Sequence, residues 1–497
     1  MADRIEKIVV AGGDDVAPMV AAALALSLGG QDVTITVVES GHGSGAAGSS
    51  LPQSATFHAF LGISPADLVK QAGATFKLGA DYTDWPRPDH HFVHPYAEHG
   101  TLLRLVPFHH YWVRQRHAGD PTPIGAYSLG ESAAREGRFA LPEPAADSIR
   151  STYRHGFHVD RGAYARVMRT QAQRAGVRFV PGTIDGVALC SDTGFIQAVT
   201  TDEGQRLEGD LFIDCTGERA RLIGEALGQT VDDRSDGLPC DGCVALSVRD
   251  VPELSPLTSV VRKRFGWSRR IPLQDRSEYQ YYYNRSLIDG AAVENLLRQA
   301  VGRESAGPVR HERLRNGWRR RPWFRNCVAI GRSGGYLEPL CISGLTLAAS
   351  ATLRLLGLFP DRACDTFLAR QYNRLAALEH ANALDVTSVF YASVEPDESP
   401  FSGLCADLSH PESARERLRL FRSHGRVIWN DEESFSRTYW ASAMLGLGHL
   451  PDSWDPLADV PAAAHTEEWL EKMRSVVRDA TDEMPSHEAF IESLLAS

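Results

Sequence analysis

The sequence predicts an α/β fold followed by a mostly helical C-terminal module. Residues 5–11 and 327–330 are short apolar runs typical of buried parallel strands, and glycines lead from each run into an apolar helix. Alternating segments between residues 177 and 217 predict a β-meander. Further helical patterns lie at residues 366–386, 411–421, 434–445 and 467–482. We therefore expect a discontinuous core over residues 1–360 and a helical module over residues 361–497 that packs on it.

Length and composition exclude several classes of protein. The 497 residues are 43% hydrophobic and 23% charged, and the net charge of −11 argues against a nucleic-acid partner or an anionic membrane surface. No stretch is apolar enough to span a membrane, and the N-terminus has no signal-peptide pattern. The 8 cysteines are scattered, so we expect reduced thiols and a cytoplasmic location. Cys240 and Cys243 form a lone C-x-x-C pair, for which no metal is expected.

The start of the chain has the layout of a dinucleotide-binding βαβ unit. The strand at 5–11 is followed by Gly12 and Gly13, by a helix of small residues at 19–27, and by a second strand that ends near Glu39. In such a unit the glycine turn lies under the pyrophosphate, and an acid after the second strand binds the ribose hydroxyls. We therefore predict the pyrophosphate at Gly12 and Gly13 and the ribose at Glu39.

This glycine turn departs from the G-x-G-x-x-G pattern. Ala11, Gly13 and Val16 occupy the three glycine positions. Asp14 and Asp15 place two negative charges where a diphosphate would lie, which predicts weak and exchangeable binding. The alternative is a Rossmann-like unit that binds no nucleotide.

Residues 324–360 contain a second strand, glycine loop and helix. Gly331 and Gly335 belong to the loop, and Ser343 and Gly344 precede the helix. Free backbone N–H groups and the positive end of a helix dipole would together form a cradle for an anion and a cofactor. The alternative is a tight turn of the kind found in any α/β domain.

Lys77 lies in an otherwise apolar, strand-like run at residues 73–78. Such a lysine is usually the solvent face of an edge strand. It could instead point into an active site and bind an anion or an oxidised halogen species. Residues 81–150 are rich in His, Pro, Tyr and Trp with weak periodicity, and we expect them to form an irregular substrate lid.

Several blocks of the chain resemble the tryptophan halogenase family of flavin-dependent halogenases. These blocks are the βαβ start, residues 74–77, 157–160, 214–217 with 238–241, 266–272, the stretch 324–360 and, more weakly, 439–456. They follow one another in the family's order over nearly the whole chain. The resemblance implies a flavin-monooxygenase-like α/β core and a mostly helical second module.

The resemblance also implies an activity. The family uses reduced FAD, O2 and a halide ion to form hypohalous acid, which reaches a lysine and halogenates an electron-rich, tryptophan-like or indole-like aromatic substrate. Lys77 falls on that lysine, Ser343 and Gly344 fall on the amides that hold the halide beside the flavin, and Pro339 falls on the start of their motif. The family takes its reduced flavin from a separate flavin reductase that reaches it by diffusion, so no NAD(P)H site is expected.

Further motif positions concern the substrate and the flavin. Trp267 and Trp440 fall on the substrate side of the family's site. A second tryptophan of the motif around Trp267 falls on Arg269. The family's flavin strap falls on residues 45–48, without its glutamate.

The family's glutamate falls on Cys341, and the serine after it falls on Ile342. A thiol cannot replace a carboxylate as a base or hydrogen-bond partner without a change in chemistry, and hypohalous acid would oxidise it readily. Three hypotheses therefore stay open: an active halogenase or close oxidative relative, an impaired homologue that serves as a binding or partner subunit, and an FAD monooxygenase. The substrate, the halide and a homodimeric state are also left open.

Overall fold

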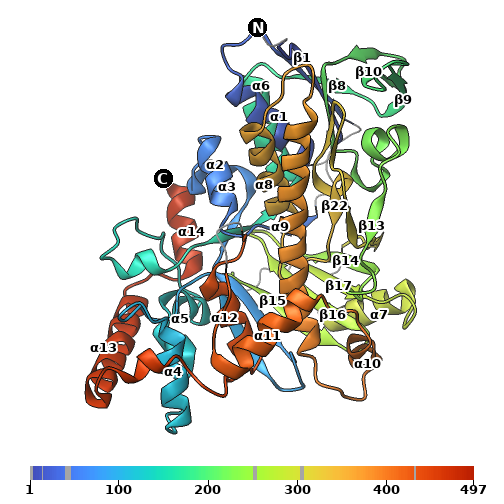
Figure 1. Cartoon of the computed structure of the whole chain (residues 1–497). Coiled ribbons are helices and arrows are strands. Elements are labelled where there is room, and N and C mark those ends of the chain that lie inside the picture. Colours follow the sequence, from blue (N-terminus) through green and yellow to red (C-terminus); the bar gives the residue numbers. More distant parts are fainter. Residues whose placement is uncertain (1–3, 14, 40–45, 250–253, 303–306, 430–432) are drawn as a thin grey trace. The chain divides into compact units, whose positions relative to one another are not determined.

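The computed structural model describes residues 4–13, 15–39, 46–249, 254–302, 307–429 and 433–497 (Figure 1). The chain forms two compact units, each assembled from three segments. Unit 1 contains Met1–Ala74, His158–Ser235 and Leu314–Ala381, and unit 2 contains Thr75–Phe157, Asp236–Arg313 and Asn382–Ser497. This division differs from the boundary expected at residue 360, because the C-terminal helices after residue 381 cluster with earlier segments of unit 2.

Unit 1 is built on a six-stranded, mainly parallel sheet. In spatial order the strands are β20 (Trp323–Phe324), β21 (Cys327–Ala329), β12 (Leu211–Asp214), β1 (Lys7–Ala11), β2 (Thr34–Glu39) and β8 (Arg178–Pro181). β1 pairs in parallel with β2 on one side and with β12 on the other. Because β12 comes from the middle of the chain, the expected sheet with strands from the start and the middle of the sequence is confirmed.

Unit 1 also contains helices, the first of which packs on β1 and β2 of this sheet (Figure 1). They are α1 (Val16–Ser27), α2 (Ser54–Phe60), α3 (Pro65–Ala72), α6 (Arg161–Arg174), α8 (Gly344–Gly357) and the first part of α9 (Thr366–Ala392). The first ten residues of α1 are buried, and five of them are alanines, whose small side chains let α6 and α8 approach α1 closely.

Short sheets complete unit 1. The meander expected between residues 177 and 217 is present as β9 (Ile184–Leu189), β10 (Ile196–Thr201) and β11 (Arg206–Glu208). The other short strands are β13 (Val231–Asp233), β19 (Gly317–Arg319) and β22 (Gly335–Tyr336), together with β3 (Ala47–Ser49), which pairs with β7 (Gly156–Asp160).

Unit 2 contains a seven-stranded sheet. Its strands in spatial order are β18 (Arg310–Arg313), β14 (Gly242–Val248), β17 (Ser277–Tyr283), β16 (Gly266–Pro272), β15 (Leu257–Lys263), β5 (Gly79–Thr83) and β6 (His91–Pro95). Helix α7 (Gly290–Val301) covers part of one face, where Val293 and Leu297 pack on Val244, Leu246 and Tyr281.

The expectation of an irregular region at residues 81–150 is wrong. Besides β5 and β6, this segment forms α4 (Phe108–His117) and α5 (Leu129–Arg135). The strands are stabilised by aromatic contacts, since the ring of Tyr82 stacks on that of Phe92 with 5.0 Å between the ring centroids. A partner far along the chain adds to this order, since the ring of Phe390 lies 4.9 Å from that of Tyr82 between centroids, and local periodicity cannot indicate such a contact.

The remaining helices of unit 2 confirm the helical C-terminal pattern. They are the end of α9, α10 (Pro400–Ala406), α11 (Glu412–His424), α12 (Arg437–Gly446), α13 (Ala463–Asp482) and α14 (His487–Ala496). Among the residues that the structure describes, no helix combines the length and the apolar composition needed to cross a bilayer.

Candidate functional site

The glycine turn after β1 is required by close packing. Gly12 has φ +149°, and a Cβ atom on it would lie 2.2 Å from the carbonyl oxygen of Cys215, at the end of β12. The N–H of Gly12 donates to the carbonyl of Val38 in β2 (2.9 Å). The turn therefore leaves β1 at the carboxyl end of the parallel sheet, where dinucleotides bind in such folds.

Asp15 does not present an uncompensated charge, which corrects the expected repulsion of a diphosphate by this residue. Its carboxylate is 2% exposed and accepts two hydrogen bonds from Arg161, from Nε at 2.7 Å and from Nη2 at 2.5 Å. This bidentate pair balances the charge of the buried acid. Asp14 lies outside the described residues.

Glu39 lies at the end of β2, where a ribose-binding acid is expected. Its carboxylate forms an ion pair with Arg169 of α6. The Arg169 guanidinium in turn stacks over the ring of Phe179, 4.2 Å from the ring centroid. Glu39 is therefore held in place by α6, and its contact with a ribose stays a prediction.

The second glycine loop meets the start of α1. Gly331 has φ +73° and opens the short helix η5 (Gly331–Ser333), and a Cβ atom on it would lie 3.2 Å from the side chain of Val16. The two glycine loops predicted from separate parts of the sequence thus lie together in unit 1. Gly335 has another reason to be glycine, because a Cβ there would lie 2.6 Å from Cβ of Trp318.

Helix α8 begins beside this loop in the sequence, after Pro339 and Leu340. The hydroxyl of Ser343 accepts from the N–H of Thr346 (3.2 Å) and donates to the carbonyl of Ser49 (2.5 Å), so it caps the helix and ties it to β3. Apart from the chain neighbours of Gly344 and the backbone of the helix itself, no heavy atom of the described residues lies within 4 Å of its Cβ position. The N-terminus of α8 therefore has room for a small anion at Gly344.

These features of unit 1 fit FAD. The glycine turn and the N-terminus of α1 suit a pyrophosphate, and Glu39 suits a ribose. The charge of Asp15 is balanced by Arg161, and the open position at Gly344 leaves space at a second helix N-terminus. Gly13 stays a predicted contact of the pyrophosphate.

Cys341 and Ile342 precede α8, and each is 5% exposed. Cys341 forms no disulfide with another described residue. Cys341, on which the resemblance places the family's glutamate, is thus buried and bears no carboxylate. The apolar side chain of Ile342 beside it is equally buried.

Lys77 of unit 2 lies at the end of β4 (Thr75–Lys77) and is only 6% exposed. The interpretation as the solvent face of an edge strand is therefore wrong. Its Nζ lies 5.5 Å from the ring centroid of Tyr96, at a distance where the ring face attracts a cation. Lys77 is a buried cation at an aromatic surface.

The sequence reasoning missed His94, which lies on β6 in the segment taken for an irregular lid. Its imidazole is buried, and its Nε2 lies 3.1 Å from the carbonyl oxygen of Tyr439. Burial lowers the pKa of His94 to about 4, and the positive charge of Lys77 acts in the same direction. Because the residues of β6 from Phe92 to Pro95 are all buried, no alternation along the strand singles out His94.

Strand β4 is fixed from two sides within unit 2. The Thr75 hydroxyl donates to the carbonyl of Pro272 at the end of β16 (2.9 Å). The N–H of Phe76 donates to Nε2 of His487, the first residue of α14 (3.1 Å), and Nδ1 of His487 donates to the carbonyl of Leu254 (2.7 Å). The backbone beside Lys77 is thereby held by a neutral imidazole.

This arrangement predicts an acid-sensitive anchor at His487. Burial lowers its pKa from 6.5 to about 4. Because the unfolded chain then binds the proton more tightly, the stabilisation is complete above pH 6.5 and is lost as the pH falls toward 4. Between pH 7 and pH 5 we expect His487 to remove about 2 kcal/mol of the free energy of unfolding. Urea unfolding at both pH values measures this loss, which His487→Gln should reduce, and an equal loss in the variant would contradict the assignment.

The two predicted substrate-side tryptophans are buried in unit 2. Trp267 stacks on Tyr282 with 4.2 Å between ring centroids, and its Nε1 donates to the Tyr391 hydroxyl (3.0 Å). Trp440 is 1% exposed and lies under the guanidinium of Arg417, 4.8 Å from the ring centroid. Their contact with a substrate stays a prediction.

Arg269 replaces one of the family's tryptophans and forms a buried polar network. Its Nε donates to Oε1 of Gln280 (2.7 Å), and its Nη2 donates to the hydroxyl of Tyr282 (3.0 Å). The substitution therefore keeps an extended planar group in this part of the sheet but exchanges an indole for a fixed positive charge.

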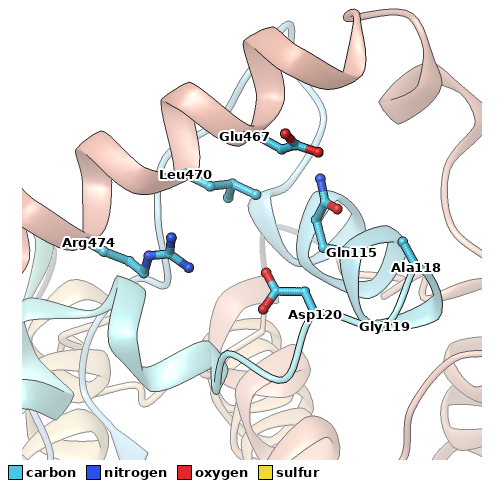
Figure 2. Close-up of a pocket in the computed structure, with 7 residues that line it drawn as sticks. All are labelled: Gln115, Ala118, Gly119, Asp120, Glu467, Leu470 and Arg474. Atoms are coloured by element: carbon cyan, nitrogen blue, oxygen red, sulfur yellow. The ribbon is translucent and has the colours of Figure 1, made fainter.

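A cavity of about 420 Å³ lies in unit 2 between α4 and α13 (Figure 2). The polar residues Gln115, Asp120, Glu467 and Arg474 line it, together with Ala118, Gly119 and Leu470. None of the predicted site residues belongs to this lining, so the cavity is not the site that the sequence indicates.

The chain is similar to known halogenases over nearly its whole length. The sequence profile of the tryptophan halogenase family matches residues 7–463. A tryptophan 6-halogenase from Streptomyces toxytricini is 27% identical over 98% of each chain. Flavin-dependent halogenases from Brevundimonas sp. BAL3 (32% identity, TM-score 0.93, 99% of each chain) and Xanthomonas campestris (33% identity, TM-score 0.94, 99% of this chain and 98% of that one) have similar structures. With nearly its whole length matched, the chain belongs to the tryptophan halogenase family.

Proposed function

We propose that the protein is an FAD-dependent halogenase that uses reduced FAD, O2 and a halide ion to halogenate an electron-rich, tryptophan-like or indole-like aromatic ring. The observation that carries the proposal is the buried Lys77, on the position of the family's lysine, in a chain that matches the family over nearly its whole length. Burial of an ammonium group costs free energy unless its charge is paired, and an oxidised halogen species is a ligand that the group could bind and orient.

The two units would divide the work. When bound and reduced, FAD supplies the electrons that activate O2. In unit 1 the glycine loops and α1 would hold FAD, and Ser343 and Gly344 would hold the halide. In unit 2 Lys77 would donate a hydrogen bond to the hypohalous acid and direct its halogen to the ring, with Trp267 and Trp440 on the substrate side.

Cys341 is the position at which this chain lacks the glutamate that the resemblance leads us to expect. Without a carboxylate at this position, another group must take the proton that the ring releases, or the reaction must be slow. An impaired homologue that serves as a binding or partner subunit is the alternative, and Cys341 is the observation that favours it. The retained Lys77 and the balanced charge at Asp15 favour the enzyme.

We extend the proposal to the partners of the enzyme. A separate flavin reductase would supply reduced FAD by diffusion, because one dinucleotide turn is visible in the sequence. The negative net charge and the free cysteines agree with a cytoplasmic protein, and a homodimer is compatible with the family assignment.

A turnover assay tests the function. The purified protein is incubated with FAD, a flavin reductase and NADH, bromide and indole in air, and the products are separated by chromatography. We expect brominated indole that disappears when the protein, the bromide or the reductase is omitted. A protein that binds FAD and indole but forms no brominated product would favour the impaired homologue, and hydroxylated indole would favour a monooxygenase.

A further inference from the structure

We propose that Arg161 is a positioning residue of the FAD site, and that its pairing with Asp15 sets the affinity for the pyrophosphate. The inference rests on the proposed function, because it concerns the cofactor of that function. It assigns a role to a charge pair that joins residues 146 positions apart in the chain.

Asp15 lies where a pyrophosphate is expected. It occupies the N-cap position of α1, yet its side chain makes no capping hydrogen bond to the helix. Both carboxylate oxygens accept from Arg161 instead. The Asp15 side chain therefore does not cap α1, and its charge is balanced by the arginine instead.

Arg161 is held in position by its surroundings in unit 1. It is the first residue of α6, and its N–H donates to the carbonyl of Ala46 (2.9 Å). A Cβ atom on Gly48 of β3 would lie 3.1 Å from its Cγ, so the arginine stem passes directly over this glycine. While the Asp15 carboxylate is 2% exposed, the Arg161 side chain is 35% exposed, so the cation is the more accessible member of the pair.

The second acid of the site has a partner on the same helix. Glu39 pairs with Arg169, two turns further along α6. One helix therefore supplies an arginine to each of the two acids that flank the predicted nucleotide. At Glu39 the expected ligand is an uncharged ribose, whereas at Asp15 it is a doubly charged diphosphate, so charge balance matters most at Asp15.

Substitution of Asp15 and substitution of Arg161 should change the affinity for FAD in opposite directions. Asp15→Asn leaves Arg161 uncompensated and should tighten FAD binding about tenfold, because a positive charge then faces the diphosphate. Arg161→Met leaves a buried carboxylate uncompensated and should weaken binding about tenfold or more. The double variant restores the balance and should bind within about threefold of the wild type.

Isothermal titration at low and moderate salt tests this with three probes: FAD, ADP and riboflavin. The proteins are the wild type, Asp15→Asn, Arg161→Met, Arg161→Lys, the double variant and Arg166→Met, an exposed arginine of the same helix that serves as the control. We expect FAD and ADP affinities to change by the same factor in each variant, with a steeper salt dependence in Asp15→Asn. Riboflavin affinity and Arg166→Met should show no change.

A purely structural role predicts another pattern. Both single variants would then bind FAD more weakly, in proportion to a lower melting temperature of the protein without FAD, and riboflavin would be affected as well. If Arg161→Met fails to fold, the FAD and ADP affinities of Asp15→Asn and Arg161→Lys test the inference. If the wild type binds FAD and Asp15→Asn binds it more weakly, this inference alone is overturned. If the wild type binds neither FAD nor ADP, the proposed function is overturned as well.

Discussion

Lys77→Ala should lower halogenation at least about a thousandfold while the oxidation of reduced FAD continues at the wild-type rate. The lysine acts on the hypohalous acid, after O2 and halide have reacted. The residues that fit FAD all belong to unit 1, and Lys77 belongs to unit 2. Halogenated product by mass spectrometry and FAD reoxidation by absorbance, measured in the same reaction, separate the two steps.

Because Lys77 is 6% exposed, truncation to alanine also removes buried volume. Lys77→Met keeps most of the stem without the charge and is the better matched variant. Lys70→Ala, at an exposed lysine of α3, is the control and should retain full activity. Undiminished product from Lys77→Met would remove this residue from the mechanism.

Cys341→Glu should raise the rate of halogenation about tenfold or more, because under the proposed function it supplies a carboxylate at the position on which the resemblance places the family's glutamate. The position is 5% exposed, so a carboxylate there is expected to lower the free energy of unfolding by about 1–3 kcal/mol. Adding Ile342→Ser should recover part of this loss by making the surroundings polar. Initial rates and urea unfolding of the parent, the single and the double variant measure both effects.

In the parent, part of the hypohalous acid should oxidise Cys341 in place of the substrate. Cys190 is an internal control for oxidants in bulk solution, since it is the most accessible of the free cysteines and hydrogen bonds from Thr193 lower its pKa. Peptide mass spectrometry after turnover should find sulfenic or higher oxidation at Cys341 before Cys190. Rapid turnover with an intact Cys341 thiol would show that the role of the glutamate has passed to another group.

Local patterns predicted much of the fold. The βαβ start was recognisable because an apolar run, a glycine turn and a helix of small residues are adjacent in the sequence, and the structure has β1, α1 and β2 in these places. The same holds for the strand, loop and helix that end in α8. The close approach of Gly331 to Val16 brings the two glycine loops together. Such proximity is expected if both loops bind the same cofactor.

Long-range partners explain what the sequence did not show. Asp15 alone predicts repulsion of a diphosphate. In the structure Arg161 balances its negative charge, and no local sequence pattern indicates this pairing because the two residues are far apart in the chain. A lone lysine in such a run usually lies on the solvent face of an edge strand, whereas Lys77 is buried beside the ring of Tyr96. In the segment of β5 and β6, aromatic packing supplied the order, which is why weak periodicity led to the wrong expectation of an irregular segment. Its role as a substrate lid stays a prediction.

The most direct test of the account is a single turnover without a reductase. The protein is loaded with one equivalent of FAD, reduced without O2, and mixed with aerated buffer that contains bromide and indole. The account predicts bromoindole, recognised by the paired masses of the two bromine isotopes, in the wild type and in larger yield in Cys341→Glu, and none in Lys77→Met. Complete reoxidation of FAD without bromoindole in both the wild type and Cys341→Glu would contradict it.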